Sequence, residues 1–201
     1  MKKDNILFVF SIMIFIFSLF IFVGTCNSLY DLIKITGKSV STGNINISIE
    51  QIVLVNFTID NVDWGSGVVS ENATKAIIDT MGNVINGSWD PVSSGFVIEN
   101  IGNINLSLNF SSLKNATTFI GGTNSSYQYK ISNIDENACV PPSGFDLDNF
   151  YEFPSEGVSV NICKYFVPGK NILFDLNLTI SYDSNTGNLS DTITLAFQES
   201  D

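Results

Sequence analysis

Residues Ile172–Tyr182 read ILFDLNLTISY, and this stretch decides the fold because its apolar residues recur at every second position. A period of two is typical of a β-strand that buries one face, since successive side chains of a strand point to opposite sides. Asp183–Asn188 then holds turn-forming residues, and the alternation resumes over Ile193–Phe197. The end of the chain therefore predicts two antiparallel strands joined by a turn.

The same period of two recurs upstream, over Asn44–Ile59, Ile104–Ser111, Tyr127–Ile131 and Val158–Ile162. Frequent turn signals separate these runs, and no amphipathic helical pattern follows residue 38. Ala138–Phe153, with two prolines and several acidic residues, is predicted to be a long loop. We therefore predict an all-β fold, an antiparallel immunoglobulin-like or jelly-roll sandwich of seven to nine strands.

The N-terminal stretch Ile6–Val23, ILFVFSIMIFIFSLFIFV, is apolar except for two serines. As a helix it would be roughly 27 Å long, close to the bilayer core of about 30 Å. Lys2 and Lys3 precede it, which favours an N-terminus inside the cell and the remaining chain outside. We predict a basic region at residues 1–5, a transmembrane helix or signal anchor at 6–23, a tether at 24–38 and an extracellular β-sandwich domain at 39–201.

Three other fates of this segment stay open. Gly24-Thr25-Cys26 offers small residues at which a signal peptidase could cut, and Val23-Gly24-Thr25-Cys26 faintly resembles a lipoprotein box. Pilin-like processing near Lys2–Asp4 would instead leave the helix on the mature chain. The expected location is the cell membrane, with a single pass, or the medium if the segment is cleaved.

The charge balance excludes several functions. Aspartate and glutamate total 20 against 9 basic residues, all of them lysine, and the net charge is −11. This balance argues against nucleic acid as a partner, because phosphate binding needs clustered positive charge. The chain has no histidine, the commonest general base and metal ligand. No catalytic motif or cofactor-binding motif is present, so we expect neither an enzyme nor a bound cofactor.

Two of the three cysteines suggest a disulfide. Cys139 and Cys163 lie in the predicted exported domain, whereas Cys26 lies at the membrane edge and has no evident role. Exported proteins meet oxidising conditions, so we predict a Cys139–Cys163 bond. It would contribute around 3 kcal/mol by the loop-entropy estimate. The alternative is two buried free thiols.

Sequons for N-glycosylation are more frequent than expected. Ten occur, whereas about four would arise by chance from this composition. Polar positions on one face of a strand are also two residues apart, which raises the count without any glycan. We nevertheless predict a glycoprotein, with these candidate sites: Asn46, Asn56, Asn72, Asn86, Asn105, Asn109, Asn115, Asn124, Asn177 and Asn188.

Other polar or aromatic groups are weaker candidates for binding sites. Asp183, Asn185 and Asp191 are spaced like the start of a calcium loop, but a hairpin turn explains them better, and we predict no metal site. Acidic residues within Phe145–Phe153 are more simply a solvated loop. Four tyrosines could line a sugar-binding face, although aromatics at strand spacing usually belong to the core: Tyr127, Tyr129, Tyr151 and Tyr165.

Several segments resemble a group of uncharacterised exported proteins from small-genome archaea of the DPANN type. The segments are Val62–Gly67, Ser94–Leu108, Phe119–Thr123, Tyr127–Lys130, Cys139, Cys163 and Asp183–Thr194. The resemblance implies an exported β-sandwich, and it supplies no catalytic residue because the group has no assigned activity.

A fainter resemblance lies in Asn100–Leu106, which is similar to a strand entry of immunoglobulin-like surface domains, including TasA-like and camelysin-like fibre subunits. It implies strand exchange between neighbouring subunits, with Asn44–Ile59 as the donor strand.

These observations lead to three functional hypotheses. The first is a membrane-anchored, glycosylated β-sandwich with a structural or adhesive role in an archaeal cell envelope. The second is a subunit of an extracellular filament or lattice assembled by strand addition. The third is a surface module that binds carbohydrate or calcium. The expected partners are the membrane, other copies of the chain, and other envelope proteins and glycans.

Overall fold

The computed structural model describes residues 9–23 and 47–200. The chain divides into two units, residues 1–48 and 49–201. Residues 9–23 are helical. Among the described residues, no helix has the length and apolar character needed to cross a membrane. The predicted basic region 1–5, residues 6–8 of the predicted span, and the tether 24–38 with its Cys26 lie outside the described residues.

The second unit is built almost entirely of strands. Its described elements are β1 (Val55–Ile59), β2 (Lys75–Asp79), β3 (Val84–Ile85), β4 (Phe96–Asn100), β5 (Leu106–Ser112), α2 (Ala116–Phe119), β6 (Ser126–Asn133), β7 (Cys139–Val140), β8 (Tyr151–Glu152), β9 (Val160–Phe166), β10 (Asn171–Ser181) and β11 (Ile193–Glu199). These eleven strands exceed the predicted seven to nine because β3, β7 and β8 have two residues each.

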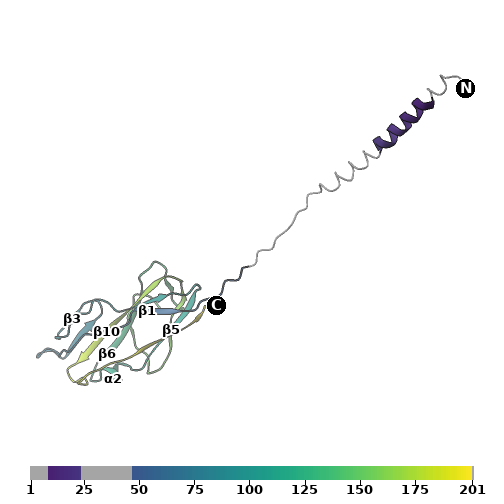
Figure 1. Ribbon diagram of the computed structural model, residues 1–201. Coiled ribbons are helices and arrows are strands. Elements are labelled where there is room, and N and C mark those ends of the chain that lie inside the picture. The colour runs from purple at the N-terminus through teal and green to yellow at the C-terminus, as the bar shows by residue number, and fades with distance from the viewer. Residues whose placement is uncertain (1–8, 24–46, 201) are drawn as a thin grey trace. The chain divides into compact units, whose positions relative to one another are not determined.

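Strand β10, formed by the stretch that predicted the fold, is the centre of a seven-stranded sheet. One of its edges pairs with β6 from Ile172 to Thr179. The other edge is shared, because β4 pairs with Asn171–Phe174 and β2 pairs with Asn177–Ser181. The outer strands β1, β3 and β8 then pair with β4, β2 and β6. Figure 1 shows β10 and β6 running side by side in this sheet.

A second sheet has four strands in the order β11-β5-β9-β7. Strands β11 and β5 are antiparallel over their full length, from Ile193 opposite Ser112 to Glu199 opposite Leu106, with no shift of register. Strand β9 lies on the other side of β5, with irregular register near Leu108. All the strand pairs in both sheets are antiparallel, as the sequence predicted.

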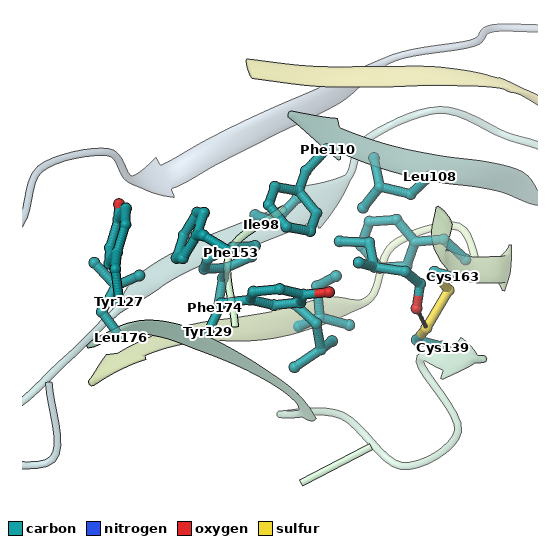
Figure 2. Close-up of a cluster of buried hydrophobic side chains, with 14 of the residues drawn as sticks. Ile98, Leu108, Phe110, Tyr127, Tyr129, Cys139, Phe153, Cys163, Phe174 and Leu176 are labelled. Atoms are coloured by element: carbon teal, nitrogen blue, oxygen red, sulfur yellow. Dashed lines mark hydrogen bonds between the residues drawn. A yellow bond between two sulfur atoms is a disulfide. The ribbon is translucent and has the colours of Figure 1, made fainter. Parts of the chain in front are cut away.

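The core lies between the two sheets and is rich in aromatic rings. Phe110 of β5 contacts Phe174 of β10 and Tyr129 of β6, with ring centroids 5.1 and 4.5 Å apart. Tyr127 stacks on Phe153 at 3.7 Å. Figure 2 shows these rings converging on one buried cluster. The alternation in β5, β6 and β10 therefore reports real burial of one face, and the predicted all-β architecture is confirmed.

The run Asn44–Ile59, whose period predicts one long strand or two shorter ones, forms a described strand only at its end. Asn44–Asn46 lie outside the described residues, residues 47–54 are not in a strand, and β1 begins at Val55. Ile47 and Ile49 are 84% and 78% exposed, although the alternation predicted a buried face. The apolar period is present in the sequence, but no described strand pairs with residues 47–49.

Two local features were not predicted. The short helix α2 begins after Asn115, whose side chain caps it and forms a reciprocal capping box with Thr118. The predicted loop Ala138–Phe153 contains the two short strands β7 and β8. These elements are too short to create a periodic signal, so sequence patterns could not reveal them.

Candidate functional site

A disulfide bond joins Cys139 of β7 to Cys163 of β9, with the two Cα atoms 5.5 Å apart. Both residues are buried, and Figure 2 shows the bond beside the aromatic cluster. The predicted pairing is therefore present. Strand β7 has two residues, and β9 is the one described strand that pairs with it. The bond therefore fixes covalently a strand that few hydrogen bonds hold.

The described sequon asparagines all avoid the buried core. Those that are exposed are Asn56, Asn72, Asn86, Asn105, Asn124 and Asn188. Those that are half-buried are Asn109, Asn115 and Asn177. The tenth, Asn46, lies outside the described residues. A glycan must project into solvent, so this distribution is compatible with the predicted modification without testing it.

Two of the half-buried amides already have structural roles. The Asn115 side-chain oxygen accepts a hydrogen bond from the Thr118 backbone at 3.1 Å, at the start of α2. The Asn177 amide nitrogen donates to the Gln128 side chain at 3.0 Å, across β10 and β6. A glycan on the Asn177 nitrogen would disturb its hydrogen bond to Gln128, and a glycan on either nitrogen would have little room because both side chains are half-buried. The six exposed asparagines are therefore the better candidates.

Asp183, the first residue of the calcium-like pattern, binds a neighbouring loop. Its carboxylate accepts hydrogen bonds from the Thr123 backbone at 2.9 Å and the Thr123 hydroxyl at 2.8 Å. Hydrogen bonds from Ser181 and then Thr123 favour the charged form and lower the pKa of Asp183 to about 2. This carboxylate joins the turn after β10 to the loop before β6.

Asp191 and Asn185 make separate contacts. The Asp191 carboxylate contacts the Ser112 hydroxyl at 2.5 Å and accepts a hydrogen bond from the Tyr127 hydroxyl at 3.2 Å. Burial, with the adjacent Asp191 charge, raises the pKa of Tyr127 above its ordinary range. The Asn185 backbone donates to Ile120 at 2.9 Å. Among the described residues, there is no group of three or more Asp, Glu, Cys or His side chains that could hold a metal ion.

The tyrosines proposed for a sugar-binding face mainly serve the core. Tyr127 and Tyr129 are buried, and burial followed by the influence of Tyr151 raises the pKa of Tyr129 to about 12. Phe145 stacks on Tyr151 at 4.6 Å, so the loop that carries them packs onto β6. Glu152, from the acidic group in this loop, accepts hydrogen bonds from Ser126 and Gln128. These residues hold the loop in place.

A buried ion pair lies on the face of the seven-stranded sheet that points away from the aromatic core, and the sequence did not reveal it. The Lys130 ammonium lies 3.2 Å from the carboxylate of Asp175, which is directly opposite it across β6 and β10. The Thr80 hydroxyl donates to the same carboxylate at 2.7 Å and accepts from the Leu176 backbone. Lys130 and Asp175 stand at the polar positions between the core-facing residues of their strands. The register that places them opposite one another could not be read from either strand alone.

The Asn100–Asn103 corner is a second feature whose role the sequence did not reveal. The Asn100 amide is fully buried and donates to the backbone oxygens of Phe166 and Ile104, at 2.8 and 3.0 Å. The Asn103 side chain accepts from the Ile52 backbone at 2.7 Å and donates to Glu50 at 2.9 Å. This corner therefore anchors both β9 and the stretch that leads into β1.

No protein-family model, curated protein or solved structure matches this chain.

Proposed function

We propose that this chain is a cell-envelope protein in which the apolar N-terminal segment holds a glycosylated domain outside the membrane. The domain would be an immunoglobulin-like or jelly-roll sandwich, and its role structural or adhesive rather than enzymatic. The envelope would be archaeal, in line with the resemblance to exported archaeal proteins. The proposal combines location, modification and architecture, each of which has separate support.

The observation that carries the proposal is the Cys139–Cys163 bond. Disulfides form and persist in oxidising compartments and are rare in the cytosol of most organisms. This one is buried beside the aromatic core and joins a two-residue strand to its sheet. A domain that relies on such a bond suits an extracellular location.

Two further features support the same location. Six sequon asparagines are exposed and accessible to a glycosyltransferase. The apolar segment 6–23 follows two lysines, the charge pattern of a segment that leaves the chain outside the membrane. The structural role is supported by the carboxylates of Asp175, Asp183 and Asp191, each of which binds a neighbouring side chain.

Fractionation and intact mass of the native protein, purified from its own cells, test this proposal. We expect full-length protein in the membrane fraction, a mass decrease of about 2 Da for the disulfide, and discrete mass increases for glycans. Removal of the glycans should return the mass to that of the chain. Protein found in the cytoplasm with free thiols and no added mass would overturn the proposal.

A second candidate function is a filament or lattice subunit assembled by strand addition. Both sheets leave an outer strand, β1 and β11, that pairs along one edge with a described strand. The predicted donor Asn44–Ile59 is, however, hydrogen-bonded within its own domain from Glu50 onward, through Asn103 and then β4. Assembly through this stretch would require those bonds to break, so another strand edge is the better candidate.

A further inference from the structure

The five described border strands of the two sheets, β1, β3, β7, β8 and β11, differ in how well they resist pairing with another chain. An unpaired strand edge presents free N–H and C=O groups, and proteins usually protect such edges with short strands, bulges, prolines or charged residues. Strands β3, β7 and β8 have two residues each. Strand β1 has five residues and a shift of register between Phe57 and Ile59. These borders are protected in the usual ways.

Strand β11 lacks these protections. It has seven residues, ITLAFQE, with no proline or lysine, and it pairs with β5 without a shift of register. Its one charged residue, Glu199, is the last of the strand. In a chain with 20 acidic residues, six consecutive uncharged residues on a strand border leave little electrostatic repulsion against a second copy.

The backbone groups that point away from β5 can be identified. The Thr192 oxygen accepts from the Leu113 backbone, and the Ser200 backbone donates to Asn105, so residues at even positions direct their backbone groups toward β5. In an antiparallel pair this direction alternates along the strand. The N–H and C=O groups of Ile193, Leu195 and Phe197 therefore point outward. No described strand pairs with them.

The side chains on this strand are also incompletely covered. The inward-facing residues of the neighbouring β5, Leu106, Leu108 and Phe110, are fully buried. Those of β11 at 193, 195 and 197 are half-buried. An additional strand beside β11 would extend the sheet and cover apolar surface at the same time.

We propose that the outward border of β11 is a self-association surface that binds the β11 of a second copy in antiparallel orientation. With a twofold axis at Ala196, Leu195 faces Phe197 of the partner subunit and Thr194 faces Gln198 of the partner subunit. The outward-pointing backbone groups exchange hydrogen bonds, and the two four-stranded sheets become one continuous sheet. The strand is self-complementary, as a twofold interface requires. This inference rests on the second candidate function and names one of its contacts, because a twofold contact alone closes a dimer and a filament or lattice needs a second contact as well.

Charge substitution at Ala196 tests the interface. Ala196 is exposed, and the twofold axis places it opposite itself, so Ala196→Lys and Ala196→Glu each set two like charges directly across the border. We expect the dimer dissociation constant of each full-length variant, measured by sedimentation analysis, to be about fivefold higher than that of the wild type. A mixture of the two variants should restore association, because lysine then faces glutamate. Circular dichroism checks that both variants are folded.

Thr58→Lys in β1 is the matched control, because Thr58 is an exposed residue on an outer strand of the other sheet. We expect it to leave association unchanged. In a Cys26→Ser background, Ala196→Cys should form a covalent dimer on mild oxidation, and Thr58→Cys should not.

The possible outcomes distinguish an error in the β11 contact from a chain that does not self-associate. Association that survives both Ala196 charge variants, or cross-linking through Thr58→Cys instead of Ala196→Cys, would overturn the β11 contact while the second candidate function stands. A wild-type chain that stays monomeric at every soluble concentration would overturn both.

Discussion

At the scale of single residues, the Asn100 amide shows how one buried polar group holds two parts of the domain together. Its nitrogen donates to the backbone oxygens of Phe166 and Ile104, and its oxygen accepts from the Gly102 backbone at 3.0 Å. Every hydrogen-bonding atom of this fully buried side chain therefore has a partner. Asn100 connects the end of β4 in one sheet to the end of β9 in the other.

Replacing Asn100 with aspartate should be strongly destabilising. The variant loses both donated hydrogen bonds and places carboxylate oxygens against two carbonyl oxygens in a buried position. We expect the free energy of unfolding to fall by about 3 kcal/mol in urea denaturation at neutral pH. Asn103→Asp, at an exposed position of the same corner, is the control and should cost below about 1 kcal/mol. Equal effects of the two variants would contradict the role assigned to Asn100.

At the scale of elements, Asp183 connects two loops at one end of the domain. The turn after β10 carries this carboxylate, and Thr123 in the loop before β6 donates two hydrogen bonds to it. Gly122 in that loop has a positive φ of 79°, and a Cβ there would lie 2.9 Å from the Asp183 carboxylate and from the Ser184 backbone. The close approach of the two loops therefore depends on glycine at this position.

The depressed pKa of Asp183 predicts a pH-dependent contribution to stability. The pKa of Asp183 is about 2 in the folded chain, against 3.8 for an unperturbed aspartate. Because the folded pKa is lower, the stabilisation is present above pH 3.8 and is lost as the pH falls toward 2. Asp183→Asn should therefore lower the melting temperature at pH 7 by more than at pH 2.5, measured by calorimetry.

Glu156→Gln, an exposed substitution in the loop before β9, is the matched control for charge removal and should have little effect at either pH. If Asp183→Asn lowers the melting temperature equally at both pH values, the charge of the carboxylate plays no part in the stabilisation.

At the scale of the whole molecule, two sheets of unequal size enclose one aromatic core, and a disulfide closes one side. Strands β5, β6 and β10 supply the rings at its centre. The bond between Cys139 and Cys163 spans 24 positions of the chain, including the loop that packs onto β6. Cross-linking a loop of this length restricts the unfolded chain and favours the folded one.

Removing the disulfide should lower stability without changing the fold. We expect Cys139→Ala/Cys163→Ala to lose about 3 kcal/mol of unfolding free energy in urea denaturation, with unchanged far-ultraviolet circular dichroism. Wild-type chain treated with a reductant should show a comparable loss. If reduction and double substitution leave the urea midpoint unchanged, the bond is not a stabilising element.

The central strands were predictable from the sequence because an apolar residue stands at every second position of each without interruption. Ile172–Tyr182 and Ile104–Ser111 correspond to β10 and β5, whose inward residues are almost all buried. The run at 45–59 has the same period, but residues 47–49 are exposed. A period shows how apolar residues are spaced along the chain and does not show whether a neighbouring strand covers them.

Among the candidate site residues, the cysteine pairing was predictable because two cysteines in one predicted domain leave one partner each. The Lys130–Asp175 pair and the Asn100 contacts were not, since each depends on which residues lie opposite one another across separate strands. Asp183 and Asn185 are hydrogen-bonded to the loop at 120–123, whereas Asp191 is hydrogen-bonded to Ser112 of β5. Local spacing alone could not reveal those partners.

The position of the disulfide has a consequence for a protein exposed to proteases. The segment between Cys139 and Cys163 contains exposed stretches at 143–144 and 155–159, the kind of loop tip that is cut first. A cut at either place leaves both fragments attached through sulfur, with the flanking strands β7 and β9 still paired. The damaged domain would thus stay together as a two-chain molecule, and its fragments would separate on a gel after reduction.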